Sequence, residues 1–374
     1  MLRYLTSGES HGKCMLTILD GMPAGLRIDE ARINDDLCRR MQGYGRGKRM
    51  KIERDIVEIL SGLRKSVTIG SPIAMTVKNI DHSMDKLPVV LEPRPGHADL
   101  VGALKYDMKD IRSVLERASA RETVARVSVG AVAKILLNEF GIRITSHVTM
   151  IGGVGSKHAG LSFGQIEMIS QKSPVRCADP SASNLMTREI DRAMEEGDTL
   201  GGIFEVLIEG VPPGLGSYVQ WDRRIDASLA RAIMSIQAVK GVGFGIGFET
   251  ARRKGSLVHD EIFYDRRKGF YRKTNNAGGI EGGITTGEDI VVQAVMKPIA
   301  TLRKPLSSVN IKTKKAVLAT VERSDVCAVP AAGVIGESVC AIEIANALIE
   351  KFGGDSIGEM RRNYQGYIEQ IRKF

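Results

Sequence analysis

The sequence predicts an α+β fold, a β-α-β sandwich in which long central helices lie between two antiparallel sheets, with an internal pseudo-duplication. Two observations support this prediction: a motif-rich segment of the chain recurs in its second half, and each copy is followed by a long apolar helix. A chain of 374 residues, 43% of them hydrophobic, can bury a core of the size that such a unit needs. We therefore expect a single domain over residues 1–374.

The first element of each half is an apolar strand between two turn motifs. The segment GESHGKCMLTILDGMPAGL at residues 8–26 aligns without a gap with GDTLGGIFEVLIEGVPPGL at residues 197–215. Chance recurrence of short Gly-Pro turns is the alternative explanation. A gapless match that is followed by further matches in the same order favours a duplication.

A helical pattern follows the strand in both halves. After Asp29, and again after Asp222, apolar residues recur at a spacing of three or four, which predicts a helix. These apolar positions are Ile33, Leu37 and Met41 in the first half and Ile225, Leu229, Ile233 and Ile236 in the second. A Gly-x-Gly-x-Gly run comes next in each half, at residues 43–47 and 241–245, and we expect both runs to end the helices.

Each half closes with a second strand and a long helix. TIGSPI at residues 68–73 and TTGEDI at residues 285–290 each lead into an apolar, strand-like run. A Glu-Arg pair then precedes each long helix, and a Phe-Gly pair ends it where we expect a left-handed cap. The helix over 123–140 is apolar nearly all round, which predicts burial. The boundaries are about 1–141 and 197–353 for the halves, 142–196 for a connecting segment and 354–374 for a C-terminal helix.

Composition limits the classes of partner. The net charge of +9 predicts an anionic partner, and nucleic acid is one alternative. Aromatic residues make up only 5% of the chain, and the basic residues lie in Gly-rich turns, which favours compact phosphorylated or carboxylated ligands over nucleic acid.

The predicted location of the protein depends on two sequence features, membrane-helix runs and signal-peptide runs. No apolar run approaches the ~20 residues of a membrane helix, and no signal-peptide run opens the chain. We therefore expect a cytoplasmic protein that does not contact a membrane. The five scattered cysteines fit neither a disulfide framework nor a metal knuckle, so we interpret them as buried thiols.

Two histidines are candidate catalytic residues because they lie in turn-like motifs. His11 lies in GESHG and His97 in RPGHAD. In the second half Leu200 occupies the position of His11, so the repeated unit folds without that histidine. A satisfied structural histidine is the alternative for each, and no histidine spacing predicts a metal site.

Arginines and one aspartate complete the candidates that the residues themselves indicate. Guanidinium groups bind phosphate and carboxylate bidentately, so arginines beside Gly-rich turns and helix starts suit a multiply anionic ligand. Solvated surface charges are the alternative. Asp325 is matched by Ser119 in the first half and could orient a proton-transfer group or make a salt bridge. The arginines are Arg40, Arg46, Arg49, Arg117, Arg121 and Arg323.

Eight motifs in order resemble the signatures of the chorismate synthase family over essentially the whole chain. They are GESHG, GYGRGKRMKIE, RPGHADLVGALKYD, ERASARETVARV, SYVQWDRRIDA, TNNAGGIEGG, MKPIATL and VERSDVCAVPAAG. The resemblance implies a lyase of the shikimate pathway of aromatic amino-acid biosynthesis. Its reaction is the anti-1,4-elimination of phosphate from 5-enolpyruvylshikimate 3-phosphate to give chorismate, with reduced FMN required and no net oxidation.

The resemblance also implies a role for individual residues. His11 would protonate the departing phosphate, His97 would interact with the reduced flavin, and Asp325 would support deprotonation near it. The cofactor-binding residues would be Arg40, Arg46, Arg117, Ala118, Ser119, Gln237, Ala238, Gly282, Lys297, Pro298, Ile299, Ala300, Thr301 and Arg323. The substrate-binding residues would be Ser10, Arg49 and Arg121.

Further implications concern partners and one departure from the family pattern. The family implies a homotetramer with no nucleic-acid partner, and FAD and NADP are further nucleotides associated with it. An NADPH-dependent flavin oxidoreductase is an alternative, and NADPH is also a candidate reductant for the lyase itself. Ala118 stands where the family has serine, so a side-chain contact there would be lost while a backbone contact survives.

Overall fold

The computed structural model describes residues 1–47, 52–157, 160–267, 269–322 and 324–374. Two predicted site residues, Arg49 and Arg323, lie outside these ranges. The described chain is α+β, as predicted, and its two larger sheets are both antiparallel.

The two larger sheets have four and five strands. The four-stranded sheet runs β1 (Arg3–Ser7), β2 (Cys14–Asp20), β6 (Ile73–Lys78) and β3 (Val57–Ile59). The five-stranded sheet runs β10 (Val239–Phe244), β15 (Ile290–Met296), β9 (Gly202–Glu209), β7 (Arg143–Ile151) and β8 (Val154–Gly155). The described chain also has two-stranded sheets outside the two larger ones. They are β4 (Leu63–Arg64) with β5 (Val67–Thr68), β11 (Ile262–Asp265) with β12 (Gly269–Arg272), β13 (Ile280–Glu281) with β14 (Ile284–Thr285), and β16 (Ser307–Val309) with β17 (Ala316–Leu318).

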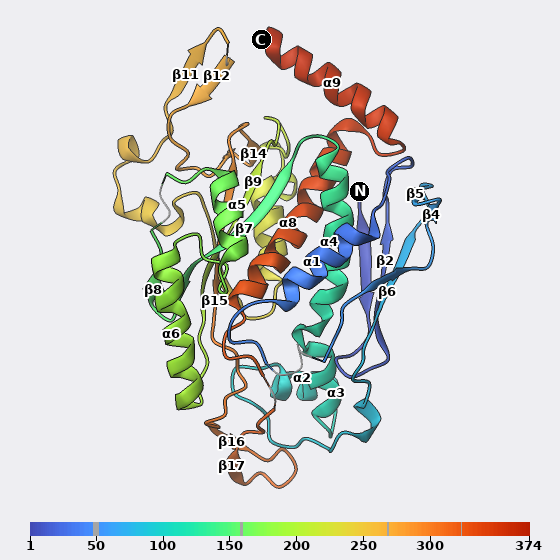
Figure 1. Ribbon diagram of the computed structural model, residues 1–374, viewed down its shortest axis with the longest axis vertical. Coiled ribbons are helices and arrows are strands. Elements are labelled where there is room, and N and C mark those ends of the chain that lie inside the picture. The colour runs from blue at the N-terminus through green and yellow to red at the C-terminus, as the bar shows by residue number, and fades with distance from the viewer. Residues whose placement is uncertain (48–51, 158–159, 268, 323) are drawn as a thin grey trace.

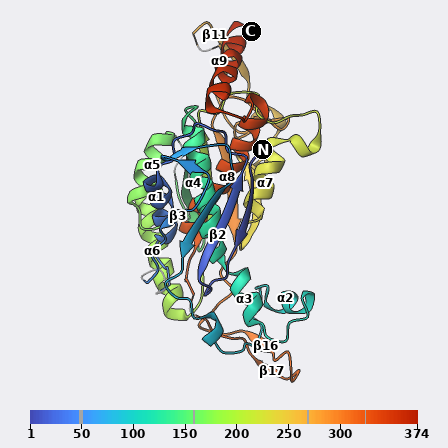
Figure 2. The same cartoon turned by 90° about the vertical axis from the view of Figure 1, so that its right-hand side faces the viewer.

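Two long helices lie between the larger sheets (Figure 1). Helix α4 (Thr123–Asn138) packs against β2 and β6, α8 (Val329–Phe352) packs against β7 and β9, and the two helices pack against each other. Figure 2 shows α1, α5 and α6 on one side of this arrangement and α7 on the other. The remaining helices are α1 (Glu30–Met41), α2 (Asp99–Lys105), α3 (Arg112–Ala118), α5 (Phe163–Lys172), α6 (Pro180–Glu196), α7 (Ile225–Met234) and α9 (Ile357–Lys373).

Helix α8 is apolar and long enough to cross a membrane by length and composition alone. However, 83% of its most apolar window is buried within the chain's own fold. Since α4, α1, α7 and the strands β7 and β9 pack against it, α8 is a core helix of this domain. The predicted burial of the helix over 123–140 is likewise confirmed, because most of α4 is buried.

The close approach of α4 and α8 depends on Gly130. A Cβ atom at Gly130 would lie 2.3 Å from Cβ and 2.5 Å from Cα of Ser338. We expect Gly130→Ala to lower the free energy of unfolding by about 1–3 kcal/mol, because the helices must separate to admit the methyl group. Urea unfolding followed by circular dichroism measures this loss.

The matched control is Gly366→Ala in α9, where a Cβ atom would meet no other atom within 4 Å. Alanine there is expected to raise the free energy of unfolding by up to about 1 kcal/mol, because alanine has a higher helix propensity than glycine. Equal changes in the two variants would contradict the packing role of Gly130.

A buried ionic cluster joins the core helices around Glu337 of α8, whose side chain has no exposed surface. Its carboxylate accepts two hydrogen bonds from Arg39 at 2.6 and 2.8 Å and one from Lys134 at 2.6 Å. Ser146 and Arg176 also donate to it, at 2.7 and 3.3 Å. Burial alone would raise the pKa of Glu337, but the surrounding cations outweigh burial and hold the pKa below its ordinary range.

Several predictions about local structure require correction. The glycines of residues 241–245 do not end a helix, because residues 239–244 form strand β10, which pairs with β15. Gly141 has a φ of 74° in the left-handed region, as expected, but Gly353 combines a φ of 85° with a ψ of 169° and is not a left-handed cap. Cys38 is exposed and Cys14 half-buried, so only three of the five thiols are buried.

Candidate active site

His11 lies in the turn between β1 and β2, and buried polar groups hold that turn. The Asn79 side chain donates to the Gly12 carbonyl at 2.7 Å, and the Ser10 amide donates to the Glu116 carbonyl at 3.0 Å. Gly8 adopts a φ of 109°, and a Cβ atom there would lie 2.2 Å from the Cys14 carbonyl oxygen. Gly8 of GESHG is therefore required by the backbone of this turn, and main-chain and Asn79 hydrogen bonds hold the turn without the His11 side chain.

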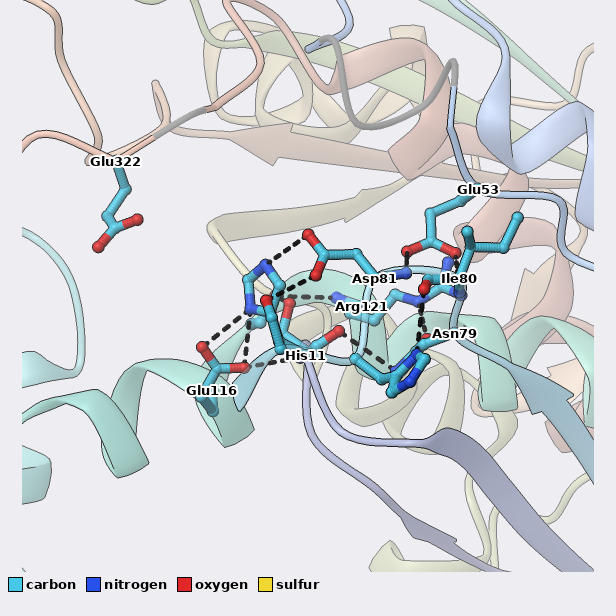
Figure 3. Close-up of polar contacts among 12 residues, drawn as sticks. His11, Glu53, Asn79, Ile80, Asp81, Glu116, Arg121 and Glu322 are labelled. Carbon is cyan, nitrogen blue, oxygen red and sulfur yellow. Dashed lines mark hydrogen bonds and ion pairs between the residues drawn. The ribbon is translucent and has the colours of Figure 1, made fainter. Parts of the chain in front are cut away.

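The His11 ring lies between two carboxylates (Figure 3). Its Nδ1 is 2.9 and 3.0 Å from the two carboxylate oxygens of Glu116, and its Nε2 is 3.9 Å from Oδ2 of Asp81. The Glu116 side chain has no exposed surface, whereas the ring is 19% exposed. Burial would raise the pKa of Glu116, but hydrogen bonds from His11 outweigh it and lower the pKa. Glu116 is therefore an ionised acceptor for the ring.

His97 precedes helix α2 and has a similar carboxylate partner. Its Nδ1 lies 2.5 Å from Oδ1 of Asp99, a side chain without exposed surface. Arg94 donates to both oxygens of Asp99, at 2.8 and 3.0 Å, and to the Thr301 hydroxyl at 2.7 Å. Burial would raise the pKa of Asp99, but hydrogen bonds from His97 and Arg94 outweigh it and hold the pKa well below its ordinary range. The Arg94 bond to Thr301 ties His97 to the predicted cofactor segment at 297–301.

Arg40 and Arg121 meet on one buried carboxylate. Asp55 accepts from Arg40 at 2.8 Å and from Arg121 at 2.6 Å, and both arginines are 5% exposed or less. Burial lowers the pKa of Arg40 to about 10. The structure therefore places these predicted ligand-binding arginines in the interior, where they fix the chain behind the His11 turn.

Arg46 and Asp325, which lie far apart in sequence, form an ion pair. Arg46 Nη1 is 2.8 Å from Oδ2 of Asp325, and the Gly47 amide donates to Oδ1 at 2.6 Å. The Arg46 and Asp325 side chains are 11% and 20% exposed. This contact joins the Gly-rich run after α1 to the segment before α8, so residues from both halves of the chain meet here.

Residues predicted to bind a cofactor line the same region. Arg117, in α3, donates to the Gly8 and Thr6 carbonyls at 3.0 Å, and the Ser119 hydroxyl donates to that of Ser10 at 3.2 Å. Ala118 ends α3. Arg117 and Ser119 thereby connect the predicted cofactor segment directly to the His11 turn.

A second predicted cofactor segment is formed by the residues just before β10 and those after β15. Ala238 has a φ of 68°, unusual for a residue with a Cβ atom, and its carbonyl accepts from the Lys297 amide at 2.9 Å. Lys297 Nζ donates to the Gly96 carbonyl at 2.6 Å, and burial lowers the pKa of this lysine. Pro298, Ile299 and Ala300 continue this segment, and the Ile299 carbonyl accepts from Thr199 at 2.8 Å.

Gln237 carries an unpaired acceptor beside these residues. Among the side chains that the structure describes, its Oε1 is buried without a hydrogen-bond partner, while Nε2 lies 3.4 Å from Glu122. A buried acceptor without a donor is costly, so a bound group with an N–H or O–H would satisfy it.

Gly282 is not brought to this region within one chain. It lies in the β13–β14 turn, before β15 begins at Ile290, whereas Lys297 follows the other end of that strand. In the described ranges, no group of three His, Cys, Asp or Glu side chains is arranged to hold a metal ion.

Sequence reasoning missed the carboxylates that hold the two histidines. Glu116 was noticed only as part of a repeated Glu-Arg pair, and no local signal links it to a histidine 105 positions away. Asp99 carried a signal, because it stands two positions after His97 in RPGHAD. The arrangement supplies two oriented imidazoles, the Arg46–Asp325 ion pair and several cations, which suits proton transfer to and from an anionic substrate.

Comparisons with known proteins agree over the full length of the chain. A family model described as chorismate synthase matches residues 2–349. Curated chorismate synthases of Geobacter sulfurreducens and Pelobacter propionicus are 55% and 57% identical, each alignment covering 100% of both chains. Chorismate synthase 2 of Bacillus cereus is 53% identical over the same shares. A crystal structure of a chorismate synthase matches with a TM-score of 0.83 at 44% identity, covering 100% of this chain and 99% of that one.

Proposed function

Because the chain belongs to the chorismate synthase family, we propose that the His11, His97 and Asp325 networks carry out its reaction in this protein. That reaction is the anti-1,4-elimination of phosphate from 5-enolpyruvylshikimate 3-phosphate, which gives chorismate in the shikimate pathway. The observation that supports this site most strongly is the pair of carboxylate-held histidines, because both rings keep exposed surface while their partners are buried.

His11 is assigned the protonation of the departing phosphate. Phosphate is a poor leaving group unless an acid or a cation neutralises its charge. Glu116 holds Nδ1, so Nε2 is the nitrogen that would face the phosphate oxygen. Asp81 lies 3.9 Å from Nε2 and would give up this position to the phosphate.

His97 and Asp325 are assigned to the flavin side of the reaction. Reduced FMN, when bound, lends electron density to the substrate and takes part in removal of the ring proton. His97 would hold a proton at Nε2 near the flavin, since Nδ1 is taken by Asp99. Asp325, held by Arg46 and the Gly47 amide, would orient the proton-accepting group.

The described residues fit a flavin mononucleotide in two respects. The buried Oε1 of Gln237 needs a hydrogen-bond donor, and a flavin ring and ribityl chain carry N–H and O–H groups. Arg117 and Lys297 supply cations for its phosphate. The remaining proposed contacts are Arg40, Arg46, Ala118, Ser119, Ala238, Gly282 and the residues 298–301, with Arg323 outside the described ranges.

Substrate binding is assigned to Ser10, Arg49 and Arg121. Ser10 is 4% exposed and accepts a hydrogen bond from Ser119, a proposed cofactor contact, which supports an assignment near the cofactor. Arg121 is held by Asp55 and by Asn79 at 2.8 Å, so it would act on the substrate's charge from behind this layer.

We also propose that the chain is one domain of two pseudo-repeat halves, residues 1–141 and 197–353, joined by 142–196 and followed by 354–374. The order β9-β15-β10 in one sheet matches β2-β6-β3 in the other and supports this division, while β7 of the connecting segment pairs with β9 as β1 pairs with β2. Helices α1 and α7 occupy the same place in the two halves, as do α4 and α8.

A cytoplasmic homotetramer is the proposed assembly. Leu5 and Ile18, which pair across β1 and β2, are 76% and 43% exposed and fit an interface between copies. Nucleic acid and membrane are not proposed partners. NADPH, through reduction of FMN by this chain or by a separate reductase, is the proposed source of reduced flavin, and no role is assigned to FAD.

The experiment that tests this function is anaerobic phosphate release from 5-enolpyruvylshikimate 3-phosphate, with chorismate absorbance followed in the same cuvette. We expect equal amounts of phosphate and chorismate with chemically reduced FMN, and neither product with oxidised FMN. Addition of NADPH to oxidised FMN tests whether the chain reduces its own flavin. NADPH oxidation without either product would favour the oxidoreductase alternative instead.

A further inference from the structure

Three histidines of the described chain contact a carboxylate at 3.0 Å or less, and two of these three pairs share one geometry. In the pairs His11–Glu116 and His97–Asp99, the carboxylate contacts Nδ1 at 2.9 and 2.5 Å. Both carboxylates have no exposed side-chain surface, whereas the rings are 19% and 22% exposed. The fixed side of each ring is therefore interior, and its other side faces outward.

The third pair shows what a purely structural arrangement looks like in this fold. His147 of β7 contacts Glu205 of β9 through Nε2 at 3.0 Å, and the ring has no exposed surface. The nitrogen used and the exposure of the ring both differ from the first two pairs. Pairing with a carboxylate is thus common to all three histidines, while fixation through Nδ1 with an exposed ring is specific to the candidate active site.

Hydrogen-bonding capacity assigns the proton on Nδ1 in both pairs. An ionised carboxylate only accepts, so a contact of 2.5–3.0 Å requires that Nδ1 donate. Arg94 Nη2 also lies 3.1 Å from Nδ1 of His97, but a guanidinium only donates and a protonated Nδ1 cannot accept. The Nη2 hydrogen is therefore directed to Oδ1 of Asp99, at 3.0 Å. Each ring is thereby left with Nε2 as the nitrogen that can exchange a proton with a ligand.

Glu116 fixes the main chain as well as the ring. One of its oxygens accepts from the His11 amide at 2.7 Å, and Arg112 lies 3.8 Å from the other. Asp99 does the same for the RPGHAD turn, because it accepts from the Arg94 amide at 3.0 Å. Each carboxylate thus sets the position of the loop, the orientation of the ring and its tautomer together.

We infer that Glu116 and Asp99 are positioning residues of the elimination, which fix His11 and His97 through Nδ1 so that Nε2 transfers protons. This inference rests on the function proposed above. An amide side chain of the same shape can present N–H to Nδ1 and so favours the wrong tautomer, as happens when the aspartate of a catalytic triad is replaced by asparagine. A structural pair such as His147–Glu205 has no such effect on turnover.

The test compares Glu116→Gln, Asp99→Asn and Glu116→Asp with the matched control Glu205→Gln. Phosphate release is measured anaerobically with reduced FMN, together with the thermal midpoint and the Kd for reduced FMN. We expect kcat to fall about 100-fold in Glu116→Gln and Asp99→Asn, with KM and the Kd for FMN within about threefold of the parent. Glu116→Asp, which keeps the charge, is expected to recover at least tenfold of the lost kcat.

Each other outcome bears on the inference. A parental kcat in folded Glu116→Gln and Asp99→Asn would overturn it, and so would a kcat of Glu205→Gln that falls as far as theirs. If Glu116→Gln does not fold, Asp99→Asn and Glu116→Asp decide the matter by the same criteria. A parent protein that releases no phosphate would instead refute the proposed function, so the two failures are distinguishable.

Discussion

Replacement of His11 by alanine is expected to lower kcat for phosphate release by about 100- to 10,000-fold, the range that a general acid supplies. The fold should survive, because Leu200 takes this position in the second half and the turn is held by Asn79 and the Ser10 amide. The Kd for reduced FMN should stay near that of the parent. Stopped-flow phosphate detection and a thermal melt on the same preparation measure both effects.

His82→Ala is the matched control for this variant. His82 is exposed, lies in the segment next to the His11 ring, and hydrogen-bonds the Ile80 carbonyl at 3.1 Å. Its replacement is expected to change kcat less than about threefold, since substitutions of exposed side chains usually have small effects. A His11→Ala protein that unfolds at a much lower temperature would identify the histidine as a structural residue.

Glu337→Gln is expected to have the largest effect on stability, a loss of about 3–5 kcal/mol in the free energy of unfolding. The change leaves the partly buried Arg39 and Lys134 and the buried Arg176 without their shared carboxylate. Asp36, which pairs with two of them, cannot neutralise all three. Urea unfolding with extrapolation to water measures the difference.

The control for this loss lies on the same helix. Glu350 pairs with Arg223, but both side chains are about half exposed, at 50% and 53%. Glu350→Gln is therefore expected to cost less than about 1 kcal/mol. Similar losses in the two variants would mean that burial of the Glu337 cluster does not determine its contribution.

The repeated turn motifs and apolar periodicities predicted the class of fold, because each such pattern spans a whole helix or strand. The helix expected over 123–140 is observed as Thr123–Asn138, since an apolar surface on all sides can only be buried. The glycines at 241–245 were assigned wrongly because a Gly-x-Gly pattern suits both a turn and a strand edge. Their pairing with β15, about fifty positions away, decides between the two.

The sequence indicated the two histidines of the candidate site, but it did not indicate which charged residues would be buried. His11 and His97 stand in loops whose other residues have turn-forming roles, so the histidines required another explanation. Arg40 and Arg121 gave no sign that they would be interior, because Asp55 reaches them only through the tertiary fold. Gly282 lies apart from the other cofactor residues for the same kind of reason, since strand β15 separates it from Lys297.

The contact between α4 and α8 also determines when the core can be completed during synthesis of the chain. The two helices are far apart in sequence, residues 123–138 and 329–352, yet each is the main partner of the other. At a synthesis rate of about 5–20 residues per second, α4 leaves the ribosome roughly 10–40 s before α8 exists. During that interval α4 can pack against α1, β2 and β6, which are made earlier, but the surface that later contacts α8 has no partner yet. That surface has to be shielded from aggregation until the last core helix is made.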